Sequence, residues 1–477
     1  MRVFTKRNAK RVFLSWLLLN LILLIIYWPL VKQLARFSPI ILPVSYSAPV
    51  DLVESQTQDI QHLKRILKYD RSFSDEERLL FIDHLEHMSQ AAGRMSEAEF
   101  FLGVSKAMAI AENGHSNVSK GPAYRSFNRS GIDVYWFSDG LFIVRAHQSA
   151  GDLVGARIIE IEGRTPEDVS EGLGAYIGGA ESWKRLYSLY FLRSPDLMHA
   201  AGLAASPDSL HIKIVNQIGQ EQAVLLTALP AAKEKASYAR SALIGLSGKS
   251  LPDEEERWRR TLTAKPEALP LYLRSFDENF LKEPIGNGVY VRAAVLFNRD
   301  GMSIKERLAE LVTNAPHGGF DFIAFDLRFS PGGDFGNVSE FAKTVETALS
   351  EDGKLYVLTG PQTFSAAIVS TALFKRYVPE KTLLIGQPMG DYGQFWAERG
   401  MSFKLPNTGY NINYATGYHD WEKGCTATHK YCFPRNARHD GIEVSLKPDA
   451  LITPSYQDYA SGRDIVMEWV LADANAD

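Results

Sequence analysis

Ser365 occupies a position in which a serine hydroxyl can become a nucleophile. The segment KLYVLTG has the pattern of a buried strand, and PQTFSAA follows it and leads into an apolar helix. A serine at the first turn of a helix has its oxygen near the positive helix terminus, where the N–H of Ala366 could face a developing oxyanion. A serine that only caps its helix would occupy the same place. On this segment alone, the capping role is the simpler interpretation.

Two glycines after the preceding strand could supply the rest of an oxyanion hole. The strand FIAFDLRF runs into the sequence SPGGD, which contains Gly332 and Gly333. Because glycine has no side chain, its backbone N–H can face a cavity closely enough to stabilise an oxyanion. A tight turn after a strand is the alternative for this motif by itself.

Together the two motifs resemble those of the C-terminal processing (tail-specific) serine protease family. The resemblance rests on a strand ending in Asp-Leu-Arg-x-x-Pro-Gly-Gly, a strand reaching Thr-x-Ser-Ala at a helix start, the segments GVYVRAAVLF and SLKPDALI, and a PDZ-like segment upstream. It implies a ClpP/crotonase-like core in which Ser365 is the nucleophile and Gly332 and Gly333 help to form the oxyanion hole.

The chain departs from the family pattern at the general base. Many members carry a catalytic lysine after the strand that follows the nucleophile helix, but no lysine lies between Lys381 and Lys404. Another branch uses a histidine in a Gly-His-Ser/Thr motif far upstream, and the sequence NGHS at 113–116 fits that motif. The resemblance therefore implies His115 as the base, because an imidazole titrates near neutral pH and a triad assembles in space. A loop histidine that caps the preceding helix is the alternative.

The resemblance also implies a carboxylate that orients the imidazole. Glu422 in HDWEKG follows Ser365 by 57 residues, a position comparable to that of the family's acid, and Asp420 and Glu398 are alternatives. The same region contains three histidines that could bind a metal ion: His419, His429 and His439. Their spacings of ten residues fit no compact ligand motif, so we expect no metal.

A mainly parallel sheet must position these side chains. The last 190 residues alternate apolar strands with helices, expected at 303–315, 338–349 and 366–377, and this alternation indicates βαβ units. Upstream, residues 52–111 have helical periodicity, and short β-like runs fill 132–229, where the segment 139–169 resembles a PDZ module. The predicted fold is multi-domain α/β. Its divisions are a cytoplasmic N-terminus and transmembrane anchor at 1–36, a helical domain at 50–125, a PDZ-like domain at 126–230, a helical connector at 231–283 and a ClpP/crotonase-like core at 284–477.

The composition limits the classes of function. The 477 residues are 45% hydrophobic and 23% charged, which is typical of a globular protein with about three domains. A balance of 52 Lys+Arg against 56 Asp+Glu leaves no basic surplus for nucleic acid. Two cysteines are too few for a disulfide scaffold or a cysteine-based zinc site. Cys425 and Cys432 could pair in an oxidising compartment or remain free thiols.

The N-terminal segment predicts a membrane anchor. Residues 12–31 are uncharged and long enough to cross the roughly 30 Å hydrocarbon layer, and only basic charges precede them. The positive-inside rule then keeps the N-terminus in the cytoplasm and the bulk of the chain outside it, in the periplasm or extracellular space. A cleaved signal peptide is the alternative, although no small-residue cleavage site directly follows the apolar run.

These observations predict a membrane-anchored, extracytoplasmic serine endopeptidase with a polypeptide substrate and no cofactor. The PDZ-like module would bind an extended polypeptide by strand addition. One alternative is a catalytically inactive peptide- or ligand-binding protein on the same fold. Another is acyl-CoA chemistry on a crotonase-like core, which export disfavours because CoA is cytoplasmic. The sequence determines neither the substrate nor the oligomeric state.

Overall fold

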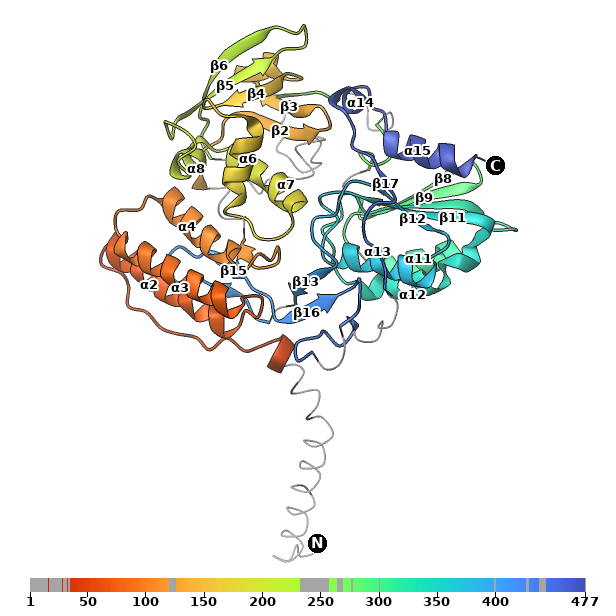
Figure 1. Cartoon of the computed structure of the whole chain (residues 1–477), viewed down its shortest axis with the longest axis horizontal. Coiled ribbons are helices and arrows are strands. Elements are labelled where there is room, and N and C mark those ends of the chain that lie inside the picture. The colour runs from red at the N-terminus through yellow and green to blue at the C-terminus, as the bar shows by residue number, and fades with distance from the viewer. Residues whose placement is uncertain are drawn as a thin grey trace, which may run out of the picture.

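The computed structural model describes most of the chain after residue 34. The described residues are 16, 28, 32, 35–119, 126–231, 257–263, 269–275, 278–299, 301–398, 400–425, 429–436 and 443–476. Apart from residues 16 and 28, the predicted anchor at 12–31 lies outside them. Within the described part of the chain, no helix has the length and apolar character needed to cross a membrane. Figure 1 shows a helical part in orange, a β-rich part in yellow and, from green to blue, a sheet covered by helices.

Three α-helices form most of the helical part, and the periodicity predicts helices there. They are α2 (Leu52–Lys64), α3 (Asp75–Gln90) and α4 (Glu97–Ala109), and the short 3₁₀ helix η1 (Arg65–Lys68) extends α2. Ser74 and Ser96 cap α3 and α4 through capping boxes with Glu77 and Glu99, so local sequence alone determines where these helices begin. α4 ends shortly before the loop that contains His115.

The β-rich part is one antiparallel sheet in the order β2-β3-β4-β5-β6. Its strands are β2 (Ile132–Phe137), β3 (Gly140–His147), β4 (Arg157–Ile161), β5 (Ser209–Val215) and β6 (Glu221–Thr227), with η2 (Gln148–Leu153) after β3. Three helices separate β4 from β5, in a region where short β-like runs were expected: α6 (Pro166–Gly174), α7 (Glu181–Leu192) and α8 (Pro195–Ala200). Trp183, Tyr190 and Phe191 of α7 are buried, and this helical periodicity is the signal that the β-rich prediction overlooked.

The predicted connector at 231–283 is described only in part. Its described residues include the strand β7 (Trp258–Arg260), which pairs with β3. Residues 232–256, in which helices were expected, lie outside the described residues. The boundaries of the connector therefore stay a prediction.

The last part of the chain is a six-stranded sheet in the order β17-β12-β11-β10-β9-β8. The strands are β8 (Phe280–Ile285), β9 (Gly288–Ala293), β10 (Phe320–Asp326), β11 (Leu349–Thr359), β12 (Thr382–Gly386) and β17 (Ala450–Leu451). All neighbours are parallel except β8 and β9, which confirms the predicted βαβ arrangement.

Helices cover both faces of this sheet. One face packs on α11 (Ile304–Thr313), α12 (Gly336–Thr344) and α13 (Ala366–Tyr377), while η4 (Val345–Ala348) leads into β11. The other face packs on α15 (Ile465–Ala474), which follows α14 (Tyr456–Ala460) (Figure 1). Because side chains alternate along a strand, Phe325 faces the first layer while Phe322 and Ala324 face the second.

A long excursion between β12 and β17 returns the chain to the helical part. It contains β13 (Gln394–Ala397), β14 (Phe403–Lys404), β15 (Asn411–Asn413) and β16 (Gly417–Asp420). β13 pairs with β16, while β15 pairs with β1 (Asn117–Val118), directly after His115. A disulfide joins Cys425 to Cys432 in this excursion, so the paired alternative is the one that the structure contains.

Candidate active site

Ser365 lies at the turn between the carboxyl end of β11 and the start of α13. Its backbone adopts φ 54° and ψ −123°, a left-handed conformation that side chains other than glycine rarely take. Among the described residues, its side chain makes no capping hydrogen bond to α13, so the capping role is not the one observed. The Thr363 hydroxyl supports the turn by donating to the Leu327 carbonyl at 2.8 Å and accepting from the Gly360 N–H at 2.9 Å.

The two glycines after β10 lie against this serine turn. Gly332 has φ +98°, and a Cβ there would lie 2.6 Å from the Phe364 carbonyl oxygen and 2.8 Å from both the Ala366 nitrogen and the Ser365 Cβ. Gly333 packs equally closely on the backbone of Leu296. The structure therefore brings the three predicted oxyanion-hole residues, Gly332, Gly333 and Ala366, to one end of the sheet. Only glycine fits the first two positions.

The His115 ring lies between two aromatic rings at the same place. Its centroid is 4.3 Å from that of Phe364, the residue before Ser365, and 5.2 Å from that of Phe395 in β13. Both pairs are stacked, and Trp183 of α7 stacks on the opposite face of Phe364 at 4.0 Å. The fold thus brings His115 to the residue next to Ser365, although 250 positions separate them in sequence. Its side chain is 17% exposed, but both of its ring nitrogens are buried from solvent.

A buried polar network anchors the loop that carries His115. The Asp70 carboxylate, fully buried, accepts hydrogen bonds from the hydroxyls of Ser72 at 2.6 Å and Ser116 at 2.8 Å. Asn113 donates to the Ser116 hydroxyl and accepts from the backbone N–H of Trp396 in β13. Residues on both sides of His115 are therefore tied to the helical part and to the excursion, which limits movement of the ring.

Asp391 is the carboxylate that the structure places beside His115. Its Oδ2 lies 3.8 Å from His115 Nδ1, its side chain is 3% exposed, and burial raises its pKa to about 7. The Gly390 N–H donates to the Thr363 carbonyl at 2.9 Å, which ties this segment to the serine turn. Sequence reasoning did not single out Asp391. Its position five residues after the end of β12 was the available signal, because sites form where loops leave the carboxyl ends of parallel strands.

The other predicted acids lie elsewhere in the excursion. Glu422 packs against Gly393, where an added Cβ would be 2.4 Å from Glu422 Cγ. Asp420 accepts from Gln394, and Glu398 Oε1 lies 3.4 Å from Nε2 of His419, on the far side of Phe395 from His115.

Neither a lysine base nor a metal cluster is found near the serine turn in the described residues. Lys381 lies at the amino end of β12, where its Nζ donates to the carbonyls of Ser350 and Glu351. Within the described ranges, no group of three His, Cys, Asp or Glu side chains could hold a metal ion. His439 lies outside those ranges.

Comparison with known proteins gives structural matches only. No protein-family profile and no curated protein matches the chain. Mature CPAF in complex with lactacystin is similar to it with a TM-score of 0.55 and 14% identity, over 89% of this chain and 100% of that chain. A second structure of mature CPAF matches with the same TM-score and identity, over 89% of this chain and 97% of that chain. The photosystem II D1 C-terminal processing protease matches at a TM-score of 0.35 and 12% identity, over 83% of this chain and 93% of that chain, which is too distant to support an argument.

The chain shares the fold of CPAF. At this identity the likeness concerns the fold alone, and it confirms a multi-domain α/β architecture. The more detailed fold assignments, a ClpP/crotonase-like core and a PDZ-like domain, stay predictions. The roles of the individual site residues also stay predictions.

Proposed function

We propose that this chain is a serine protease whose nucleophile is Ser365 and whose general base is His115. One observation carries the proposal: the strained serine turn, the two glycines and an imidazole from a distant loop meet at one end of the sheet. The likeness of the fold to CPAF, a serine protease, supports it. The missing lysine is no obstacle, because His115 offers a proton acceptor near Ser365.

The reaction would follow from this arrangement. Ser365 Oγ attacks the carbonyl carbon of the scissile peptide bond while His115 accepts its proton. The oxyanion that forms is stabilised by the backbone N–H groups of Gly332, Gly333 and Ala366. His115 then gives the proton to the departing amine, which leaves an acyl-enzyme. A water molecule, deprotonated by His115, hydrolyses the ester and restores the Ser365 hydroxyl.

We assign the role of the orienting carboxylate to Asp391. Its oxygen faces Nδ1 of His115, which leaves Nε2 for the serine, and above its pKa of about 7 the ionised carboxylate would attract an imidazolium. A distance of 3.8 Å is long for a hydrogen bond, but such contacts often shorten when substrate binds. Glu422, which the family resemblance implies, is the competing assignment.

The remaining parts of the proposal concern the substrate and its compartment. The PDZ-like sheet would bind an extended polypeptide by strand addition, and β2 is available for this as the strand at one end of the sheet. The apolar segment at 12–31 would anchor the chain in a membrane with the catalytic part outside the cytoplasm. The disulfide between Cys425 and Cys432 supports an oxidising compartment.

The proposal can be tested by incubating the purified full-length chain with a mixed peptide library and identifying new termini by mass spectrometry. We expect cleavage by the wild-type chain and none by Ser365→Ala or His115→Ala variants that remain folded. Peptide binding without cleavage by the wild-type chain would instead support the alternative of an inactive binding protein. Cleavage that continues in Ser365→Ala would contradict the proposal.

A further inference from the structure

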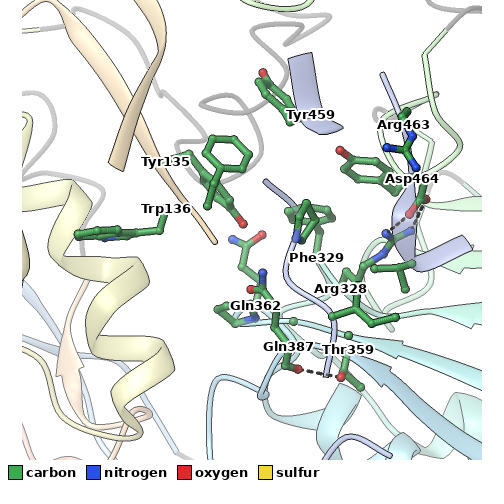
Figure 2. A pocket seen from close by; sticks show the side chains of 18 residues that line it. Tyr135, Trp136, Arg328, Phe329, Thr359, Gln362, Gln387, Tyr459, Arg463 and Asp464 are labelled. Atoms are coloured by element: carbon green, nitrogen blue, oxygen red, sulfur yellow. Dashed lines mark hydrogen bonds and ion pairs between the residues drawn. The ribbon is translucent and has the colours of Figure 1, made fainter. Parts of the chain in front are cut away.

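A pocket opens beside the serine turn, between the β-rich part and the parallel sheet. Its volume is about 50 Å³ once open solvent is left out, and it opens toward solvent on one side. β2 supplies Tyr135 and Phe137, the segments after β10 and β11 supply Phe329 and Gln362, and Tyr459 of α14 closes the far side (Figure 2). The pocket therefore lies at the same carboxyl end of the sheet as Ser365, although Ser365 is not among the residues that line it.

Aromatic rings dominate the wall of this pocket and its charges are already paired. Arg328 donates to the carboxylates of Asp326 and Asp464 and stacks on the ring of Tyr272 at 4.6 Å. Arg463 is paired with Asp458 and Glu468. Because both guanidinium groups are engaged, the pocket has no cation to spare for an anionic ligand. It suits an uncharged group with a flat, apolar surface.

Among the described residues of the wall, Gln362 supplies a buried acceptor without a donor, and Trp136 Nε1 is a buried donor without an acceptor. The Gln362 side chain is 7% exposed, and its Oε1 is buried with no hydrogen-bond donor among the described residues. Figure 2 shows the amide directed into the pocket, toward the ring of Tyr135. A buried acceptor without a donor costs roughly 1–3 kcal/mol, so a bound group that donates a hydrogen bond here gains more than it would in water.

The pocket is within reach of a polypeptide bound at Ser365. Gln362 precedes Ser365 by three residues, so their Cα atoms are at most about 11 Å apart. An extended peptide advances roughly 3.3 Å per residue. A side chain about three residues from the scissile bond can therefore enter the pocket while the bond itself lies at Ser365.

From these observations we infer that the pocket is a specificity subsite for an aromatic substrate side chain that donates a hydrogen bond, above all tyrosine. The aromatic wall holds the ring, and Gln362 Oε1 accepts from the phenolic hydroxyl. This inference deepens the proposed function, because it names the residue that the protease selects near the scissile bond.

The inference can be tested without catalysis. N-acetyl-tyrosinamide, N-acetyl-phenylalaninamide and N-acetyl-alaninamide are titrated into the full-length chain in detergent, and binding is measured by ligand-observed NMR. We expect the tyrosine amide to bind about fivefold more tightly than the phenylalanine amide, because it adds one hydrogen bond to a buried acceptor. The alanine amide should bind most weakly.

Two variants identify the residue responsible. Gln362→Leu should remove the preference for tyrosine over phenylalanine while preserving that for phenylalanine over alanine. It should also keep or raise the thermal midpoint, since it removes an unpaired buried acceptor. Gln387→Leu makes the same chemical change in the wall of the same pocket and should retain the preference for tyrosine. Equal affinities for the tyrosine and phenylalanine amides, no saturable binding, or a preference that survives in Gln362→Leu would overturn the inference.

The same library used to test cleavage separates the two proposals. Cleavage sites with no enrichment of tyrosine over phenylalanine within about three residues would overturn the subsite and leave the protease standing. The expected amide affinities without any cleavage would retain the subsite and reject the protease.

Discussion

At the scale of single residues, the candidate site depends on one unusual backbone conformation. Ser365 has a positive φ, and Gly332 packs against its turn more closely than a residue with a side chain could. Such strain persists only where the surrounding structure imposes it, and here the Thr363 hydroxyl and the start of α13 hold the turn. This conformation holds Ser365 directly after Phe364, the residue on which the proposed base His115 stacks.

The assignment of the carboxylate predicts opposite outcomes for two variants. Asp391→Asn should lower kcat/KM by roughly 100-fold or more, because the His115 imidazolium that forms in the transition state loses its negative partner. Glu422→Gln likewise replaces a carboxylate with an amide, at the acid that packs against Gly393. It should lower kcat/KM by less than tenfold. Peptide cleavage by both variants measures this directly. A large loss in Glu422→Gln with little change in Asp391→Asn would reverse the assignment.

The raised pKa of Asp391 also predicts how stability depends on pH. Its pKa is about 7 in the folded chain and 3.8 when unfolded, so between these values the folded state holds the proton more tightly. The contribution of this residue to stability is therefore fully present below about pH 4 and is lost as the pH rises through about 7.

Thermal unfolding of the wild-type chain and of Asp391→Asn at about pH 5 and about pH 8 measures this effect. The variant should gain stability relative to the wild-type chain at the higher pH. Parallel changes in the two midpoints would show that Asp391 ionises normally.

Part of the site could be predicted from local sequence and part could not. Ser365 and the two glycines belong to short motifs beside strands, so their proximity follows from a parallel sheet. Asp391 was missed because its contact with His115 depends on how the excursion after β12 folds back, whereas its place just after a parallel strand indicates only that it lies near the site.

At the scale of elements, the end of the parallel sheet holds the site together. The Leu296 N–H donates to the Gly332 carbonyl at 2.8 Å, so the segment after β9 supports the glycines after β10. β11 and β12 supply the serine turn and the Asp391 segment. The ends of four neighbouring strands, β9 to β12, thus lie together at the carboxyl edge of the sheet, which is where open α/β sheets bind their ligands.

Replacing Gly332 should disrupt the packing between these strand ends. In Gly332→Ala, a Cβ would lie less than 3 Å from backbone atoms of Phe364 and Ala366. We expect cleavage to fall by roughly 100-fold or more, because the oxyanion donors are displaced, and the thermal midpoint to fall as well.

Gly219→Ala is the matched control for this variant. Gly219 also has a positive φ, +80°, but an added Cβ would meet nothing within 4 Å. The Gly219→Ala variant should therefore be only about 1–2 kcal/mol less stable than the wild-type chain. Its activity should be unchanged. Equal effects of the two variants would mean that backbone strain alone, and not the close approach to Ser365, makes Gly332 necessary.

The elements themselves were predicted unevenly. The strands and helices of the parallel sheet follow from apolar runs and helical periodicity, and α13 matches its predicted range. The helix α12 ends at Thr344 and the 3₁₀ helix η4 continues to Ala348, so the helical stretch nearly matches the expected range 338–349. The helices α7 and α8 were missed inside a region interpreted as β-rich.

At the scale of the whole molecule, the segment before α2 joins parts that are far apart in sequence. Phe37 is buried and packs edge-on against Phe433 at 5.6 Å, and its carbonyl accepts from the Thr416 hydroxyl at 2.7 Å. The guanidinium of Arg65 donates to the Leu42 carbonyl. Residues 37–49, which the predicted domains left unassigned, therefore belong to the folded protein.

This packing predicts the effect of removing the Phe37 side chain. Phe37→Ala should destabilise the chain by about 3 kcal/mol, since it leaves a cavity between the N-terminal segment and the excursion. Phe297→Ala, at a position 54% exposed, should have little effect on stability. Denaturant unfolding of both variants measures the difference. An unchanged midpoint for Phe37→Ala would show that the segment contributes little to the fold.

The central claim is that the hydroxyl of Ser365 is activated by His115, and the rate of labelling by a fluorophosphonate tests it most directly. Mass spectrometry of the wild-type chain should locate the label on residue 365, and Ser365→Ala should take up none. Folded His115→Ala should react at least about 100-fold more slowly, the loss expected when a general base is removed. A label that persists in Ser365→Ala, or an unchanged rate in His115→Ala, would contradict the account.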